Sequence, residues 1–354
     1  MKFCLFSTLI TFLPPILAAQ DQTTTSQSDS ADSVKPAPVV TGGMAFNTTF
    51  SPGVQTLSPT INPLFLVPLG NRFLLEGEVS LSSDLEHNSG VWGPKVFNKE
   101  VEYLQLDYTL NPGLTVVVGR ILTPFGIYLE RYHPEWIRDL QVAPIIFGIS
   151  HNQSMGAELR GATHLTRGVD LTYTGFYAVN STAKYFDGQR GGGGRASLFF
   201  SGPRLELGFS YNRRLGDQRF NLFAWDATWN ARAFPLDLRS EVFKTGTLGC
   251  GYWLEAAYRL NKVSHNAFLR RSQLVVRGEQ YFAPMQSAMA GSDAMSMGSE
   301  NYLPDRNTTR PMAGWNYYLT DAVKLSFAFG RSFATSQNQN IYSAGVTFRF
   351  GLAG

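Results

Sequence analysis

The sequence predicts an all-β protein, a transmembrane antiparallel β-barrel of about 16 strands, from its composition and from its alternating pattern of hydrophobicity. Of 354 residues, 44% are hydrophobic, 13% aromatic and only 16% charged, whereas soluble domains contain about 25% charged residues. Beyond the N-terminal segment, no apolar run approaches the ~20 residues of a membrane helix. A closed barrel is then the remaining way to cross a bilayer, because lipid tolerates no unpaired sheet edge.

Segments of about ten residues alternate between apolar and polar side chains. Two examples are DLTYTGFYAVN (170–180) and RLELGFSYN (204–212). Successive side chains on a strand point to opposite faces, so each segment has one apolar and one polar face. Because the sequence offers no helix to cover the apolar face, we expect lipid to cover it. A soluble sandwich is the alternative, and the N-terminal segment described below argues against it.

Sixteen strands are predicted, and their number is even, which places both termini on one side of the membrane. The connections on that side should be short, and those on the opposite side should be long, at 83–98, 123–152, 181–193 and 282–307. The segments near 57–67 and 237–247 have the weakest pattern, so 14 or 18 strands remain alternatives. The predicted strands are 41–50, 60–68, 72–82, 99–110, 114–122, 153–163, 168–180, 194–201, 203–214, 218–231, 236–245, 250–260, 266–281, 308–320, 322–335 and 340–350.

The N-terminus is typical of a secreted protein. Residues 1–19 combine Lys2, an apolar core and small residues at the expected cleavage site, which predicts a signal peptide. Residues 20–40 are rich in Ser, Thr, Gln and Asp, and we expect a disordered periplasmic leader. The barrel is predicted over 41–350, followed by a C-terminal tail, 351–354. Only Cys250 would remain after cleavage, which excludes an internal disulfide.

Four stretches resemble known outer-membrane proteins. NIYSAGVTFRF (340–350) is similar to the C-terminal signal of bacterial outer-membrane barrels, which implies recognition by the barrel-assembly machinery. VVVGRILTPFG (116–126), LVVRGEQYF (274–282) and GWNYYLTDAVKLSFAFGRSF (314–333) resemble the phosphate-selective porin O/P-like family of bacterial outer-membrane β-barrel porins. The resemblance implies a homotrimeric channel in outer-membrane lipid for passive diffusion of small hydrophilic solutes or ions. The arginine ladder and lysine cluster behind phosphate selectivity in that family are not located here.

The segment 123–152 connects the fifth and sixth predicted strands and is therefore the third outer loop. Its resemblance to the third loop of sixteen-stranded porins implies that it folds into the lumen and narrows it, since a barrel of this size leaves a wide aqueous channel. The alternative is a cap on the barrel mouth that contacts no solute. The charged residues predicted at the constriction are Arg120, Glu130, Arg131, His133, Glu135, Arg138 and Asp139, and the aromatic residues able to anchor the loop are Phe125, Tyr128, Tyr132 and Trp136.

Charged residues at inward positions of the strands are expected to set ion preference. Acids predominate in the third to ninth strands and bases in the eleventh to sixteenth, which predicts a weak field across the pore. The net charge of +3 adds a mild anion preference. The alternative is that these are paired, solvated charges without a transport role. The predicted pore-wall residues are Glu76, Glu78, Asp107, Arg160, Arg239, Arg259, Arg271, Arg277, Lys324 and Arg349.

The hypothesis that the protein is an enzyme has little support in the sequence. His151, Asn152 and Ser154 faintly suggest an outer-membrane phospholipase, in which His would activate a Ser nucleophile, but the spacing differs. The histidines show no metal-ligand spacing, and basic residues do not cluster with aromatic ones as nucleic-acid binding requires. We therefore expect a non-enzymatic protein without cofactor, metal or nucleic acid, with an outer-membrane hydrolase or adhesin as the alternative.

Overall fold

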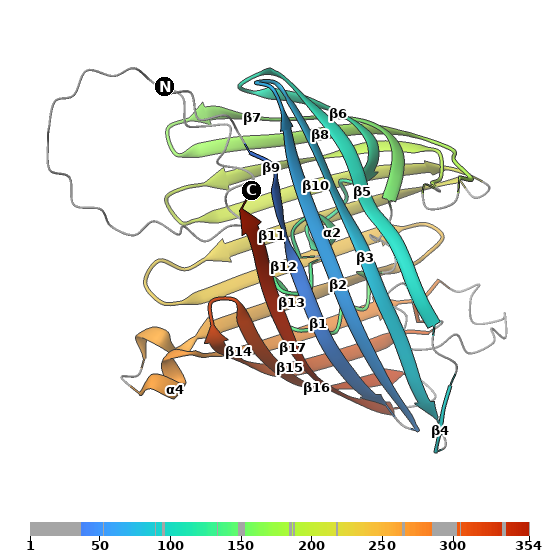
Figure 1. Ribbon diagram of the computed structural model, residues 1–354, viewed down its shortest axis with the longest axis vertical. Coiled ribbons are helices and arrows are strands. Elements are labelled where there is room, and N and C mark those ends of the chain that lie inside the picture. The colour runs from blue at the N-terminus through green and yellow to red at the C-terminus, as the bar shows by residue number, and fades with distance from the viewer. Residues whose placement is uncertain are drawn as a thin grey trace, which may run out of the picture.

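A computed structural model of the protein describes residues 37–353, except 52, 89, 94–95, 133, 148–152, 184–185, 187, 217–218, 264–265, 285–302, 305 and 335–337. Sixteen strands form the wall of a barrel (Figure 1). They are β1 (Val39–Ser51), β2 (Val54–Leu69), β3 (Phe73–Asn88), β5 (Val96–Asn111), β6 (Leu114–Leu122), β7 (Gln153–Thr166), β8 (Val169–Val179), β9 (Gly191–Phe200), β10 (Leu205–Leu215), β11 (Arg219–Asn230), β12 (Leu236–Thr245), β13 (Cys250–Arg259), β14 (Ser272–Phe282), β15 (Thr308–Thr320), β16 (Val323–Ala334) and β17 (Asn338–Ala353).

Each wall strand pairs antiparallel with the strands that precede and follow it, and the first strand pairs with the last. The β1–β17 ladder runs from Val39 opposite Ala353 to Phe50 opposite Tyr342. Closure pairs the two edges that an open sheet would leave exposed. The predicted all-β barrel of sixteen strands is therefore confirmed, and the two weakly patterned segments form β2 and β12. Among the described residues, no helix is long and apolar enough to cross a membrane.

Several predicted boundaries were wrong because main-chain pairing continues where no apolar face is required. β3 extends to Asn88 and β5 begins at Val96, so most of the predicted connection 83–98 is strand, with Ser83 opposite Phe97 and Asp84 opposite Val96. The two-residue strand β4 (Val91–Trp92) pairs with the end of β3. Residues 351–353, predicted as tail, belong to β17 and pair with the start of β1 at 39–41.

The two ends of the barrel differ. The end that carries the chain termini has mostly tight turns, and the opposite end has the third loop and the connection 283–307 (Figure 1). One turn at the terminal end is longer than predicted, because residues 260–271 form the short helices η1 (Leu260–Lys262) and α4 (Ala267–Arg270) before β14 begins at Ser272.

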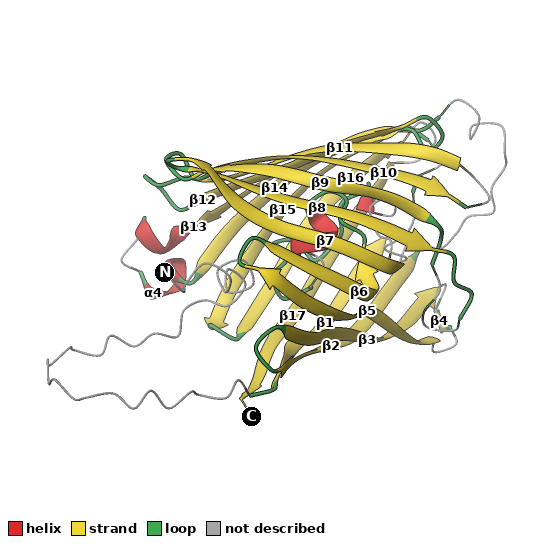
Figure 2. Cartoon of the chain, turned by 90° about the horizontal axis from the view of Figure 1, so that it is seen from above, coloured by secondary structure: helices red, strands yellow, loops and turns green. Residues whose placement is uncertain are grey.

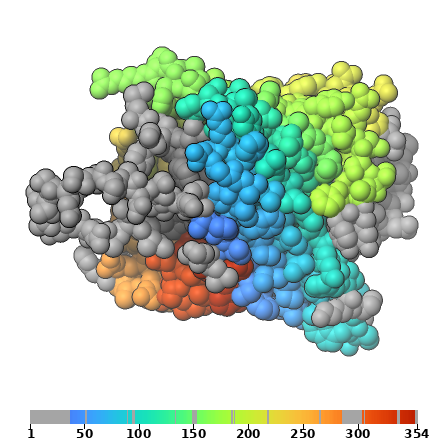
Figure 3. All heavy atoms as spheres, turned by 45° about the horizontal axis from the view of Figure 1, so that its top comes forward, coloured from blue at the N-terminus to red at the C-terminus, as the bar shows by residue number. Residues whose placement is uncertain are grey.

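Side chains alternate across the wall as a membrane barrel requires. In β12, Glu241 and Phe243 are buried on the inner side, whereas Val242 between them is exposed. Outward positions around the barrel expose apolar and aromatic side chains, a surface suited to lipid. Figure 3 shows one side of this surface, where β1 to β9 lie next to one another. The outward residues include Leu159, Tyr177, Leu207, Phe209, Trp225, Tyr252, Leu254, Val276, Phe327, Phe329 and Tyr342.

A charge on this outer surface should destabilise the barrel according to its depth. Leu254 lies in the middle of β13 and is 53% exposed, and Leu69 lies at the end of β2. We expect Leu254→Arg to lower the free energy of unfolding in lipid vesicles by about 2–4 kcal/mol, and the matched Leu69→Arg by about 0–1 kcal/mol. Denaturant titration followed by Trp fluorescence measures both. Equal costs at the two positions would contradict a lipid-facing surface.

Candidate functional site

The third loop begins after β6 and contacts strands far around the barrel. Its helix α2 (Tyr128–Tyr132) lies among the wall strands in both Figure 1 and Figure 2. Described residues of the loop form hydrogen bonds or salt bridges with β1, β10, β12, β14, β15 and β16. Most of the wall partners belong to the C-terminal half of the chain, from β10 onward, so the loop crosses from the strands that carry it to the opposite wall.

Backbone amides at the start of the loop are fixed by two inward side chains. The amide of Gly126 donates to Oγ of Ser210 at 3.1 Å, and those of Ile127 and Tyr128 donate to one Glu241 oxygen at 3.2 and 3.3 Å. Gly126 has φ +70°, and a Cβ there would lie 2.2 Å from Glu241 Oε1. Only glycine permits both this backbone conformation and this close approach.

The charged residues of α2 face strands β9 and β10. Arg131 donates from Nη1 and Nη2 to the two carboxylate oxygens of Glu206, both at 2.6 Å, a bidentate pair of the strong, directional kind. Glu130 is 3.7 Å from Nη1 of Arg195, which also binds Asp226. The Glu130 side chain is 41% exposed and is the least buried charge of this group.

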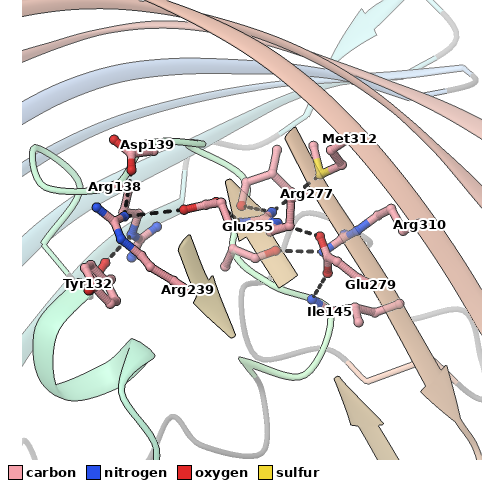
Figure 4. Close-up of polar contacts among 12 residues, drawn as sticks. Tyr132, Arg138, Asp139, Ile145, Arg239, Glu255, Arg277, Glu279, Arg310 and Met312 are labelled. Atoms are coloured by element: carbon pink, nitrogen blue, oxygen red, sulfur yellow. Dashed lines mark hydrogen bonds and ion pairs between the residues drawn. The ribbon is translucent and has the colours of Figure 1, made fainter. Parts of the chain in front are cut away.

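Asp139 joins the loop to β12, β14 and β15, and Figure 4 shows its contact with Arg239 of β12. Its carboxylate lies 2.6 Å from Nη1 of Arg239 and accepts from Gln273 at 3.0 Å, while its carbonyl accepts from Asn316 at 2.8 Å. Lys324 donates to the carbonyls of Arg138 and Trp136. Burial of these groups is compatible with folding because each has a polar partner.

A second network holds the returning part of the loop. Arg277 donates to Glu279 at 2.7 Å and to the carbonyl of Val142. Arg310 bridges Glu279, at 2.9 Å, and the carbonyl of Ala143, at 2.7 Å. The amide of Ile145 donates to Glu279, as Figure 4 shows. Because buried ion pairs pay a large desolvation cost, this network determines the position of the loop more than it adds net stability.

An apolar cluster inside the barrel supplies the stabilising contribution. Phe125, Ile127, Leu129 and Phe147 of the loop are almost fully buried against inward residues of β11–β14, including Trp253. The ring of Tyr128 meets those of Phe147 and Trp253 edge-on, with centroids 5.1 and 5.9 Å apart. Each such side chain contributes about 1.5–3 kcal/mol on full burial. The inner wall partners are Leu222, Ala224, Phe243, Trp253 and Tyr281.

The tip of the loop contacts the first and last strands of the barrel. Trp136 packs on Gly43 of β1, where a Cβ would lie 2.3 Å from its Cδ1 atom. The guanidinium of Arg349, in β17, lies over the Trp136 ring at 5.8 Å. Glu135 accepts a hydrogen bond from Asn47 of β1 at 3.2 Å. A glycine in β1 is therefore what makes room for the loop.

The predicted constriction residues do not form one charged ring. Arg131, Glu135 and Asp139 bind the wall directly, and Arg138 donates to the Tyr132 carbonyl at 3.3 Å and lies over the Tyr128 ring. Arg120 belongs to β6, is buried, and donates to the Val101 carbonyl of β5 at 2.6 Å. His133 lies outside the described residues.

Two predicted wall residues lie at the terminal end instead of along the lumen. Arg271 ends helix α4, is exposed, and donates to the carbonyl of Leu319 at 3.2 Å, so its assignment to the wall was wrong. The alternation rule failed there because residues 266–271 are not strand. Arg259 is the last residue of β13 and lies over the ring of Tyr318. Arg239, Arg277, Lys324 and Arg349 do lie on the inner face, in contact with the loop.

The wall formed by β3, β5 and β7 is rich in acids. Glu76 and Asp107 share Arg160, with Glu76 3.2 Å from its Nη2. Gln105 also donates to Glu76, at 2.5 Å. Glu78 accepts from Asn62 at 3.4 Å, and Glu102 accepts from Gln153 at 2.9 Å. Glu158 is buried, and no hydrogen bond or salt bridge joins it to another described residue.

Several residues that hold the loop could not be predicted from the sequence. Glu241, Ser210, Gln273 and Asn316 are isolated polar residues at inward positions, and nothing in their spacing distinguishes them from solvated wall residues. The apolar partners did leave a signal. Segments such as GYWLEA (251–256) carry large apolar residues on both faces, and a strand that is apolar on both faces is covered on both.

Comparison with solved structures finds bacterial porins. The anion-selective porin from Comamonas acidovorans is 12% identical, with a TM-score of 0.58 over 89% of this chain and 99% of that chain. OmpF of Salmonella typhi, in complex with daunomycin, is 12% identical, with a TM-score of 0.55 over 88% and 97%. This is a porin fold. OprB of Pseudomonas putida, in a low-pH structure, is 11% identical, with a TM-score of 0.54 over 88% and 91%.

These identities establish the fold alone. The sequence matches no protein-family model. It also matches no curated protein. The resemblance to porins in general is therefore supported by the fold, while membership of the phosphate-selective family stays a prediction.

Removal of the Glu241 carboxylate should release the start of the loop. Glu241→Ala leaves the amides of Ile127 and Tyr128 without their acceptor, at a cost of about 1–3 kcal/mol. We expect trypsin to cleave this variant after Arg131 or Arg138 under conditions in which the parent resists. The matched control is Val242→Ala, one residue away on the outer face. Equal resistance of the two variants would show that Glu241 does not hold the loop.

Proposed function

We propose that the protein is an outer-membrane porin, a channel for passive diffusion of small hydrophilic solutes and ions. The observation that carries the proposal is the fastening of residues 123–147 to inward side chains of a barrel whose outer surface is apolar. Lipid outside requires the apolar surface, and an aqueous interior suits the charged inner wall. A loop held across such an interior narrows the path of a solute and leaves the strand pairing of the wall intact.

In this proposal the third loop forms the narrowest part of the channel. The helix α2 presents Glu130 and Arg131 beside the wall residues Arg195 and Glu206. Most loop charges are used to bind the wall, so their first role is to hold the loop in place. The remaining exposed charge, above all Glu130, is available to passing ions.

The local charges favour cations, in contrast to the mild anion preference expected from the net charge of +3. The bases of β12–β16 already bind wall acids or loop carbonyls. Across the barrel, Glu76, Glu102 and Asp107 outnumber Arg120 and Arg160. A local excess of carboxylates raises the cation concentration near the wall, since charges in a confined pore are poorly screened. We therefore propose a weak cation preference.

We also propose a homotrimer and assembly by the barrel-assembly machinery, as the family resemblance implies. The apolar outer surface, which includes Phe46 and Phe50 of β1, supplies area for subunit contact. Cross-linking in mild detergent should then yield trimers. A protein that yields only monomers at every detergent and protein concentration would contradict this assembly.

The hydrolase alternative has no specific support. Ser154 is buried, and its Oγ lies 2.8 Å from Oγ1 of Thr123. His151 and Asn152 lie outside the described residues. No observation on the described residues favours an adhesin either.

Shortening the loop should widen the channel. We expect replacement of residues 127–147 by a short Gly-Ser linker to raise single-channel conductance in planar bilayers, because the narrowest section dominates the resistance of a water-filled pore. The replacement also exposes Phe243 and Trp253 inside the barrel, so a second variant with both changed to Ser provides the control for folding. A shortened variant that assembles and conducts as the parent does would contradict the proposed constriction.

Neutralising an exposed acid of the loop should reduce the cation preference. We expect Glu130→Gln to lower the ratio of potassium to chloride permeability, measured as a reversal potential in a salt gradient. Asp170→Asn is the control, because Asp170 pairs with His164 at the terminal end of the barrel. A parent protein that prefers anions would refute the proposed cation preference. An equal change in the permeability ratio of the control would show that charge outside the constriction causes the effect.

A further inference from the structure

The turn between β13 and β14, residues 260–271, has features that the channel does not require. Its described residues, 260–263 and 266–271, include η1 and α4. Oδ1 of Asn266 accepts from the amide of Phe268 at 2.8 Å, and Oγ of Ser272 donates to the Phe268 carbonyl at 3.0 Å. Arg271 donates to the carbonyl of Leu319 and accepts from the amide of Tyr318. The turn is therefore fixed against β15.

Apolar side chains of this turn continue the outer surface of the barrel. The Phe268 ring stacks on that of Tyr317, with centroids 5.0 Å apart, and lies 5.6 Å from that of Trp315. Trp315 in turn stacks on Phe327 of β16. Phe268 is still 50% exposed, and Val263 is 61% exposed. Figure 3 shows the orange residues of this region at the surface beside the red C-terminal strands.

The same turn is basic. Residues 260–271 contain three basic residues, Lys262, Arg270 and Arg271, and no acidic residue. The neighbouring turn between β15 and β16 contains one acidic residue, Asp321. Exposed cations in the same short turn as an exposed aromatic ring, at the end of a membrane barrel, match the two parts of a lipid, a charged headgroup and an apolar chain. In Figure 1, α4 projects from the end of the barrel that carries the termini.

We propose that this turn binds the headgroup of an anionic phospholipid in the leaflet nearest the chain termini. Lys262 and Arg270 attract the phosphate, and an acyl chain lies along Phe268 and Trp315. The proposal rests on the membrane location proposed above. A soluble anion would satisfy the bases but would leave the adjoining exposed rings uncovered, and the continuity of these rings with the lipid-facing surface of β14–β16 favours lipid.

Native mass spectrometry of the detergent-purified protein tests the site. The probes are phosphatidylglycerol, phosphatidylcholine with the same chains, and inorganic phosphate. We expect phosphatidylglycerol to bind more tightly than phosphatidylcholine, and the Lys262→Gln, Arg270→Gln variant to lose this binding roughly tenfold. The matched control, Arg167→Gln with Arg232→Gln, removes two cations from other turns at the same end and should retain it. The Phe268→Ser variant should bind both lipids more weakly than the parent.

Three results would overturn the proposal. They are equal binding of the two lipids, equal loss in the control variant, and full competition by inorganic phosphate, which would assign the cations to a soluble anion. Circular dichroism checks that each variant is folded. Conductance of the same variants tests the channel separately, because a protein that conducts normally yet binds no anionic lipid contradicts the lipid site alone.

Discussion

A closed wall of sixteen strands encloses more space than its inward side chains fill, and the rest of the molecule depends on this constraint. Described residues of the third loop pack against side chains of the wall. Apolar loop residues such as Phe125 and Phe147 pack on an inner patch around Trp253, and buried polar groups fix the loop around that patch. The wall is thus divided into a part that the loop covers, β11 to β14, and a part from which the loop starts, at β6.

This division changes the meaning of the charges on the wall. Arg277 and Lys324 face inward, yet both donate to loop carbonyls. Glu158 is also an inward residue, but its electrostatic partner is Arg160 of its own strand. Residues with equivalent positions in the strand pattern therefore differ in their contacts, because only Arg277 and Lys324 lie where the loop covers the wall. Inward position alone does not define a pore-lining residue.

The same physical constraints explain which features of the structure could be predicted from the sequence and which could not. Alternation revealed the strands because lipid imposes it, and it failed at 83–88 and 351–353, where main-chain pairing continues without an alternating apolar face. The loop was recognisable by its length and composition, whereas its wall partners were not. A contact such as Glu241 with the amide of Ile127 joins residues 114 positions apart, and no local pattern encodes it. Arg271 was misplaced because a short helix interrupts the expected strand.

The position of Trp136 bears on the order of assembly. This side chain lies between Gly43 of the first strand and Arg349 of the last. Its binding site exists only when the two ends of the chain have met, because the β1–β17 ladder brings these residues together. The tip of the loop therefore reaches its final position after the barrel has closed.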